Sequence, residues 1–235
     1  MKLNKVLIVG ASGGIGSAVA LALAQEGYDS VLMGRNRDSL TSIADTCIES
    51  GGNSFPIVCD IAQTSTIKSK VSEAIEILGG LNFLINCAGI SNRGALHESD
   101  LDRSDAILDT NLRSHYYLAR FALEEINKQP GGAVIKIGSV NFAYPGVNLY
   151  LAATQGIDGY AAALFEDVRE FGTKVCTIKP GYVNTELVRS DNLDSALMIQ
   201  PEDISRTILY LLSMSGTACP TEIVILPQRS PYKSV

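Results

Sequence analysis

Seven short apolar runs recur along the chain, and a stretch with helical periodicity separates each run from the next. The runs are rich in Val and Ile and are typical of strands buried on both faces of a parallel sheet. They lie at 5–9, 30–33, 54–58, 82–86, 133–138, 174–178 and 222–226. The helical stretches are Ile15–Glu26, Ser39–Ser50, Thr64–Leu78, Ile107–Asn127, Ala152–Phe171 and Pro201–Met214. This alternation predicts a Rossmann-like, doubly wound α/β sheet with helices on both faces, in one domain over residues 1–235.

Composition narrows the class of protein. The net charge of −6 disfavours nucleic-acid binding, which needs a basic face. The five cysteines are scattered and form no CxxC pair, so neither a metal site nor a disulfide framework is expected. The start of the chain is better explained by a strand, a glycine turn and a helix than by a secretion signal, and no segment is apolar enough to span a membrane. We therefore expect a cytoplasmic protein with no membrane partner.

The stretch VLIVGASGGIGSAVALALA places Gly10, Gly14 and Gly16 between the first strand and its helix. Glycines permit a tight turn and let a ligand approach the backbone closely, and amides at a helix start attract an anion. The spacing is GxxxGxG, which is neither GxGxxG nor a Walker loop. The alternative is an ordinary glycine-rich turn without a ligand.

The end of the second strand bears on which dinucleotide is bound. An NAD site usually has an acidic residue here to hold the ribose 2′-hydroxyl. Instead Gly34 stands at that position, and Arg35 and Arg37 follow. The missing acid and the two arginines favour a 2′-phosphate and hence NADP(H). The alternative is that these arginines, Arg37 above all, are solvated loop charges.

Two further strand ends carry candidate cofactor contacts. Asp60 follows the third strand, beside an expected adenine, and Asn86, Ala88 and Gly89 follow the fourth. Asn86 could instead be a plain turn residue at the end of its strand.

Together these motifs resemble the short-chain dehydrogenase/reductase family over essentially the whole chain. GxxxGxG, Asp60, NCAG, TNL, IGSV, Tyr150 and PGYVNT occur in that family's order. The resemblance implies a seven-stranded parallel sheet, nicotinamide chemistry on a small carbonyl or alcohol substrate, and a homodimer or homotetramer.

Carried over by position, the resemblance implies three catalytic residues. Tyr150 matches the general acid/base, Ser139 the serine that orients the substrate carbonyl, and Asn111 the asparagine that holds a water in a proton relay. For the NADP(H) contacts it implies Gly10, Ser12, Gly14, Ile15, Gly16, Arg35, Asp60, Ile61, Asn86, Ala88, Gly89, Thr154, Pro180, Gly181, Val183 and Thr185.

Several positions depart from the family pattern. Val9 stands where the glycine loop usually begins with Thr, and Cys87 where NNAG has its second Asn. Ser139 and Tyr150 are 11 residues apart, a shorter interval than usual, which could displace Ser139. Most important, Thr154 stands at the lysine of YxxxK.

That lysine bonds the nicotinamide ribose and lowers the tyrosine pKa from its ordinary value near ~10. Threonine can bond a ribose hydroxyl but brings no charge. Without compensation the rate would fall about 100-fold, and alcohol oxidation, which needs tyrosinate, would suffer more than carbonyl reduction. We therefore weigh three functions: an NADP(H)-dependent oxidoreductase with an atypical site, a noncatalytic cofactor-binding homologue, and a non-redox dehydratase or isomerase.

Two lysines and two histidines could modify this site. Lys179, at the end of its strand, is the better candidate for a substitute cation, because Lys136 lies mid-strand on the face opposite Ile135, Ile137 and Ser139. His115 is expected in a helix–helix interface with Tyr116 and Phe121, although it could share a face with Asn111. His97 is expected at the surface.

The last part of the chain carries two further expectations. The segment 186–200, with its Leu and Met residues and Arg189, is predicted to form a lid over an apolar substrate, the alternative being a plain helical connection. The final residues, PQRSPYKSV, are predicted to form a surface tail.

Overall fold

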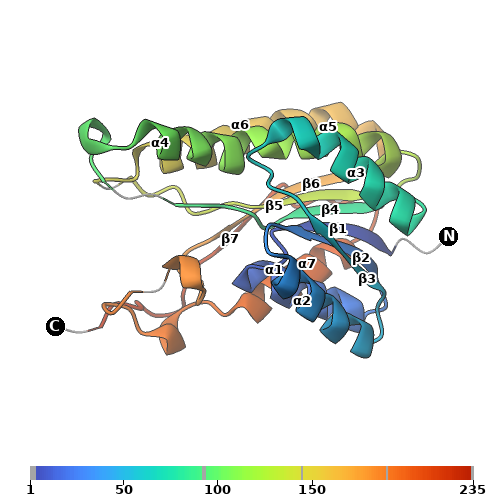
Figure 1. Cartoon of the computed structure of the whole chain (residues 1–235), viewed down its shortest axis with the longest axis horizontal. Coiled ribbons are helices and arrows are strands. Elements are labelled where there is room, and N and C mark those ends of the chain that lie inside the picture. The colour runs from blue at the N-terminus through green and yellow to red at the C-terminus, as the bar shows by residue number, and fades with distance from the viewer. Residues whose placement is uncertain (1–3, 92–93, 144, 189, 234–235) are drawn as a thin grey trace.

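A computed structural model of the chain contains one sheet of seven parallel strands in the order β3-β2-β1-β4-β5-β6-β7 (Figure 1). It describes residues 4–91, 94–143, 145–188 and 190–233. The strands are β1 (Lys5–Val9), β2 (Asp29–Gly34), β3 (Ser54–Val58), β4 (Phe83–Asn86), β5 (Ala133–Ile137), β6 (Lys174–Pro180) and β7 (Glu222–Ile225). The seven-stranded, doubly wound prediction is thus confirmed.

The helices form two layers, one on each face of the sheet (Figure 1). On one face lie α1 (Gly14–Gln25), α2 (Arg37–Glu49) and α7 (Pro201–Ser213). On the other lie α3 (Thr64–Leu78), α4 (Leu101–Leu108), α5 (Ser114–Ile126) and α6 (Asn148–Val168). No helix in the described part of the chain combines the length and the apolar character needed to cross a bilayer.

Successive side chains of the central strands point to opposite faces of the sheet and pack into two separate cores. Val6 and Ile8 pack toward α1 and α7, whereas Leu7 and Val9 pack toward α3 and α5. All four are essentially without exposed surface. Strands whose two faces are both covered need apolar side chains on both, which is why the Val- and Ile-rich runs form the middle of this sheet.

The strand order reverses between β1 and β4, and ligands of open α/β sheets bind at the carboxyl ends of strands beside such a reversal. Here two backbone segments approach one another directly. Gly10 has φ +76°, and a Cβ there would lie 2.6 Å from the amide nitrogen of Ala88. Only glycine permits both this conformation and this contact.

The predicted helix Ile107–Asn127 is not continuous. A π-helical turn, Asp109–Arg113, joins α4 to α5 and contains Asn111. Single π-turns within helices are frequent at functional sites, because they rotate the following side chains relative to the preceding ones. Apolar periodicity alone did not reveal this turn.

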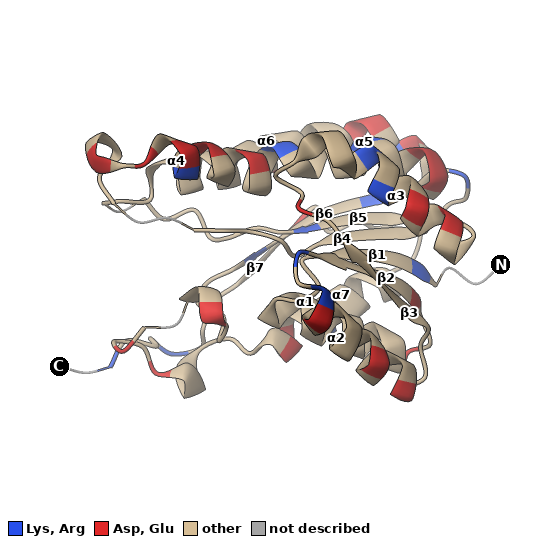
Figure 2. Cartoon of the chain, in the orientation of Figure 1, with Lys and Arg blue, Asp and Glu red and all other residues tan. Residues whose placement is uncertain are grey.

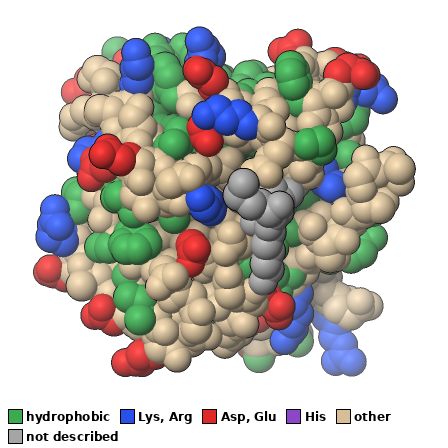
Figure 3. Space-filling model, turned by 90° about the vertical axis from the view of Figure 1, so that its right-hand side faces the viewer, with side chains coloured by type: hydrophobic (Ala, Val, Ile, Leu, Met, Phe, Trp, Pro, Cys, Tyr) green, Lys and Arg blue, Asp and Glu red, His purple; other side chains and the backbone are tan. Residues whose placement is uncertain are grey.

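Charged residues lie mainly on the helices and at strand ends, and most of each strand is uncharged (Figure 2). On the end of the molecule that carries the N-terminus, side chains of both signs are interspersed with hydrophobic ones (Figure 3).

The glycine turn gives a first prediction. A Cβ on Gly16 would lie 2.2 Å from the carbonyl oxygen of Gly10 and 2.8 Å from Cα of Ala11. Because these are backbone atoms that cannot swing away, Gly16→Ala should lower the free energy of unfolding by about 2–3 kcal/mol, measured by urea denaturation. A Cβ on Gly159, within α6, would meet none of the described atoms within 4 Å, so Gly159→Ala should instead stabilise by about 0.5–1 kcal/mol. Equal effects of the two substitutions would contradict the close approach.

Candidate active site

Two cavities adjoin at the carboxyl edge of the sheet. The first, which we call the glycine-loop cavity, has a volume of about 180 Å³. It is lined by Val9, Gly10, Ser12, Gly13, Gly34, Arg35, Cys59, Asp60, Ile61, Cys87, Ala88, Gly89, Ile90 and Thr110. The second, the tyrosine cavity, has a volume of about 350 Å³ and contains Ser139 and Tyr150.

The glycine-loop cavity has the character of an anion site. Helix α1 begins after Gly13, whose N-cap position offers no side-chain hydrogen bond, and its first turn holds no acidic residue. The first amides of the helix therefore remain available to a ligand, and the helix dipole favours a negative one. This arrangement fits the diphosphate of the dinucleotide that the sequence predicts.

Two positions at the end of β2 shape the far side of this cavity. Arg35 is exposed and lines it. Gly34 is buried, and a Cβ there would lie 3.1 Å from Oγ of Ser12 and 3.4 Å from Leu40. The space that an acidic side chain would occupy in an NAD site is thus narrow, while a guanidinium stands at the cavity wall.

The loop after β4 is held by a network of side-chain amides. Asn86 Oδ1 accepts a hydrogen bond of 3.0 Å from the amide of Ala88. Asn111 accepts a bond of 2.9 Å from the amide of Ile90 and donates one of 2.8 Å to the carbonyl of Ile90. Asn111 reaches this loop because the π-helical turn directs it there. It therefore fixes the cavity wall, and neither it nor Asn86 lines the cavity itself.

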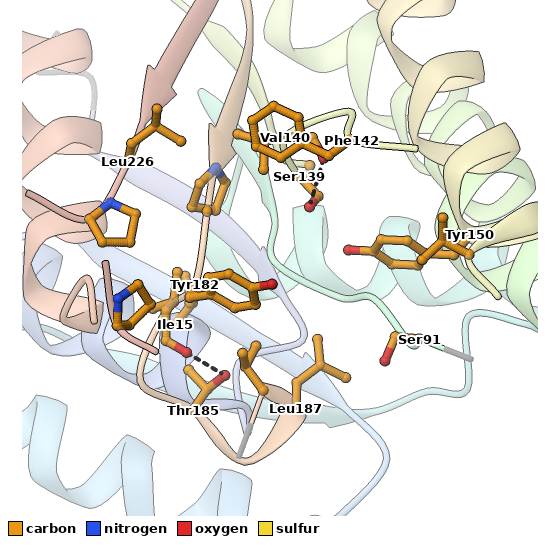
Figure 4. Close-up of a pocket in the computed structure, with 18 of the residues that line it drawn as sticks. Ile15, Ser91, Ser139, Val140, Phe142, Tyr150, Tyr182, Thr185, Leu187 and Leu226 are labelled. Atoms are coloured by element: carbon orange, nitrogen blue, oxygen red, sulfur yellow. Dashed lines mark hydrogen bonds between the residues drawn. The ribbon is translucent and has the colours of Figure 1, made fainter. Parts of the chain in front are cut away.

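The tyrosine cavity joins the end of β5 to the start of α6. Tyr150 lies in the first turn of α6 and Ser139 lies just after β5. Their hydroxyl groups both point into the cavity (Figure 4). Among the described residues, Ser139 Oγ otherwise makes only a long contact of 3.4 Å, with the carbonyl of Val140. The short interval in the sequence thus leaves both residues lining one cavity.

The loop after β6 brings the two cavities together. Pro180, Gly181, Val183 and Thr185 line the tyrosine cavity, as does Ile15 from α1. Thr185 reaches the glycine loop, since a Cβ on Gly14 would lie 2.8 Å from its Cγ2. A ligand lying along the glycine loop would therefore meet this loop next, on its way to Tyr150.

Thr154 lies one turn after Tyr150 and is buried. Its hydroxyl lies 3.1 Å from the carbonyl of Tyr150 and 3.0 Å from that of Leu151, so its proton is shared within its own helix. Thr154 is not among the residues that line the two cavities. A contact from Thr154 to a ribose hydroxyl remains a prediction, with only its oxygen left to accept.

Lys179 was the better candidate for a cation near the site, but it is Lys136 that bonds the wall of a cavity. Lys179 is engaged by Asp158 at 2.8 Å and by Glu222 at 2.7 Å. Burial disfavours the charged form of Lys179, but the bonds to these two carboxylates outweigh it and raise its pKa. Lys136 is buried and donates a hydrogen bond of 2.5 Å to the carbonyl of Ala88, in the wall of the glycine-loop cavity. Lys136 does lie on the face of β5 opposite Ile135, Ile137 and Ser139, as the alternation predicted. That face is the one that α6 covers.

His115 is buried between helices, as expected, but its partners differ. Its ring meets Tyr160 of α6 edge-on at 5.6 Å, and Nδ1 lies 3.4 Å from Nδ2 of Asn86. Tyr116 is 43% exposed and contacts Tyr117 instead. Burial, with a smaller contribution from Lys136, lowers the pKa of His115 to about 3, so it is neutral at pH 7. His97 is exposed, as predicted.

The end of the chain is not a free surface tail. Pro227, Arg229, Ser230 and Pro231 line the tyrosine cavity. The amide of Asp194 donates to the carbonyl of Pro231 at 2.8 Å, and the amide of Lys233 donates to that of Asn192 at 3.0 Å. Tyr232 Oη lies 2.5 Å from Oη of Tyr182. The two prolines favoured a surface tail, and the sequence pattern carries no signal for this docking.

The predicted lid, 186–200, contains two 3-10 turns, Glu186–Val188 and Ser195–Leu197, and no longer helix in its described part. Leu187 and Val188 line the tyrosine cavity, and a bridge from Val183 to Ile199 ties the ends of the segment together. Arg189 lies outside the described residues. No group of three or more potential metal-ligating side chains occurs among the residues that were described.

Comparison with known proteins places this geometry in context. Residues 4–196 match the family model described as short chain dehydrogenase. An uncharacterized oxidoreductase of Staphylococcus aureus strain MRSA252 is 28% identical over 227 residues, which cover 95% of this chain and 97% of the relative.

Solved structures agree with the fold. A dehydrogenase/reductase from Sinorhizobium meliloti 1021 has a TM-score of 0.89 at 26% identity, with 97% of this chain and 95% of that chain covered. A short-chain dehydrogenase/reductase from Serratia marcescens has a TM-score of 0.88 at 26% identity, with 96% and 97% covered. A short chain dehydrogenase from Burkholderia cenocepacia, solved in complex with NADP, has a TM-score of 0.89 at 24% identity, with 95% and 96% covered.

The asparagine in the π-helical turn can be tested by stability. Asn111→Ala would leave the half-buried amide and carbonyl of Ile90 without the partners that they have in Asn111, and should lower the free energy of unfolding by about 2–3 kcal/mol. The exposed Asn148, which bonds the carbonyl of Gly94, serves as the control, with an expected loss of about 0.5 kcal/mol or less. Urea denaturation measures both. Similar losses would show that Asn111 does not brace the loop.

Proposed function

The chain belongs to the short chain dehydrogenase family, and we propose that it is an NADP(H)-dependent oxidoreductase that reduces a small, apolar ketone or aldehyde, or oxidises the corresponding alcohol. The observation that carries the proposal is the convergence of Tyr150 and Ser139 on one cavity, beside the contact of Thr185 with the glycine loop. Proton donor, carbonyl anchor and dinucleotide site then lie next to one another.

The chemistry follows from these placements. When bound along the glycine loop, a nicotinamide dinucleotide would supply or accept a hydride at the substrate carbon. Tyr150 gives its hydroxyl proton to the oxygen that becomes the alcohol, and Ser139 holds that oxygen by a hydrogen bond. Asn111 fixes the loop at Ile90, and we propose that it also helps to hold a water in the path by which Tyr150 regains its proton.

Three observations support NADP(H) as the cofactor. Arg35 lines the glycine-loop cavity, where its guanidinium would pair with a 2′-phosphate. Gly34 leaves little room for an acidic side chain. The Burkholderia cenocepacia protein of the same fold was solved with NADP. The remaining contacts that we propose are those predicted from the sequence, with Asp60 and Ile61 toward the adenine.

The lining of the tyrosine cavity supports an apolar substrate. Val140, Phe142, Leu187 and Leu226 all contribute side chains to it. A volume of about 350 Å³ lies within the range of small-molecule sites. We propose that the segment 186–200 covers the substrate and that the protein forms homodimers or homotetramers.

The proton donor is tested by Tyr150→Phe, which keeps the ring and removes the hydroxyl. NADPH-dependent reduction of a ketone should fall by about 100-fold or more, because no proton reaches the developing alkoxide. NADPH binding should change little. Tyr210→Phe, on the exposed surface of α7, is the matched control and should leave the rate unchanged. The assay follows NADPH absorbance with a panel of apolar ketones and aldehydes.

Cofactor preference is tested by Arg35→Ala. Loss of the charged bonds to a 2′-phosphate should weaken NADPH binding by about 10- to 100-fold and leave NADH binding unchanged. Arg37→Ala, two residues on and outside the cavity lining, should change neither. Fluorescence titration measures all four affinities. NADPH binding without turnover on any carbonyl would favour a noncatalytic homologue, and no binding of either dinucleotide would end the cofactor assignment.

A further inference from the structure

A buried lysine lies beneath the loop that forms the wall of the glycine-loop cavity. Lys136 of β5 is paired in register with Asn86 of β4 and Thr177 of β6. Side chains in such a row share one face of the sheet, and Val134, two residues earlier, belongs to the core beneath α5 and α6. Lys136 is 4% exposed.

The side chain of Lys136 extends toward the carboxyl edge of the sheet. Its Nζ bonds the carbonyl of Ala88, a residue two positions beyond Asn86 and so about 6–7 Å nearer that edge than the register row of Lys136. This is the level of Lys179, which lies two residues beyond Thr177. Lys179 is bonded by Asp158, one helical turn after Thr154 on α6. Lys136 thus lies on the face of the sheet that α6, the helix of Tyr150, covers, and its electrostatic neighbour His115 meets Tyr160 of that helix edge-on.

No carboxylate among the described residues neutralises Lys136, in contrast to Lys179 with its two. The titratable groups that face it are Cys87 at the end of β4 and His115 of α5, with Tyr160 of α6 behind the histidine. Burial raises the pKa of the Cys87 thiol to about 12, and His115 is neutral, so neither supplies a counter-charge at pH 7. Burial lowers the pKa of Lys136 itself to about 8, which still leaves most of it charged at pH 7.

Keeping an unpaired ammonium group in the interior destabilises a fold, and a methionine of similar length would fill the same space without that cost. Structural bracing of one carbonyl does not explain the charge. A positive charge beside a tyrosine that must release and regain a proton does explain it, because it stabilises the tyrosinate form.

We propose that Lys136 is the positioning residue that supplies the positive charge of this active site, acting from the sheet beneath the Ala88 carbonyl in place of a lysine at position 154 on the helix. The inference rests on the proposed function. Thr154 is compatible with it, because a helix residue whose hydroxyl is bonded inward leaves the charge to come from elsewhere.

The test compares Lys136→Met with a matched control. Lys174 is also a buried lysine of the sheet, 6% exposed, whose Nζ bonds a single carbonyl, that of Met214, on the face away from Lys136. A unit charge acting over roughly 8–10 Å inside a protein changes an ionisation equilibrium by about tenfold or more. Lys136→Met should therefore lower kcat for both carbonyl reduction and alcohol oxidation. For oxidation, kcat of Lys136→Met should be about tenfold lower than kcat of the Lys174→Met control.

The pH profile separates charge from packing. Removing a cation raises the pKa of the tyrosine. The pH at which the rate of alcohol oxidation rises should therefore increase by about one unit in Lys136→Met and stay unchanged in Lys174→Met. The double variant Lys136→Met/Thr154→Lys should restore most of the rate and return this limb. If Lys136 had only a structural role, a new positive charge at position 154 on α6 would not restore the rate or the pH profile.

Each outcome separates the inference from the function on which it rests. If the wild type reduces carbonyls and Lys136→Met matches Lys174→Met in rate and profile, the inference is wrong and the proposed function stands. A Lys136→Met rate that falls with an unmoved profile and no rescue by Thr154→Lys also overturns it. If the wild type binds NADPH but is inactive, the proposed function fails, and the inference fails with it, since no proton transfer then needs the charge.

Discussion

The direct approach of two backbone segments at the centre of the sheet is the contact on which the rest of the site depends. Gly10 lies against Ala88 where β1 and β4 end side by side, and no side chain can separate them. Because this contact is made, the start of α1 opens toward the loop after β4, and Arg35 stands at the far wall. The loop after β6 then closes the line from the glycine turn to Tyr150.

A row of polar residues crosses the otherwise apolar layer beneath α5 and α6. Asn86, Lys136 and Thr177 stand in register on three neighbouring strands. They mark the level at which the core ends and the candidate site begins, because the preceding row on this face of the three strands, Leu84, Val134 and Val175, is apolar. The sheet therefore provides a buried positive charge, that of Lys136, as well as structural support for the helices that cover it.

The sequence predicts the architecture well and the site in part. A strand that is buried on both faces and a helix that is apolar on one face have different periodicities, so the two helix layers and the sheet could be predicted directly. The role of Tyr150 was predicted from the resemblance to the family. Three features could not. The π-helical turn at Asn111 has no signature in apolar spacing. Lys136 was placed on the correct face, but which helix covers that face depends on packing. The docking of Pro231 depends on bonds between segments far from regular structure.

The docked end of the chain has a consequence for how selectivity can change. Residues 227 and 229–231 form one wall of the tyrosine cavity, yet they lie after the last strand and contribute nothing to the pairing of the sheet. Substitutions at these positions would alter the shape of the cavity without changing the pairing of the seven strands. In the proposed enzyme, the shape of the substrate cavity can therefore vary while Tyr150 and Ser139 keep their places.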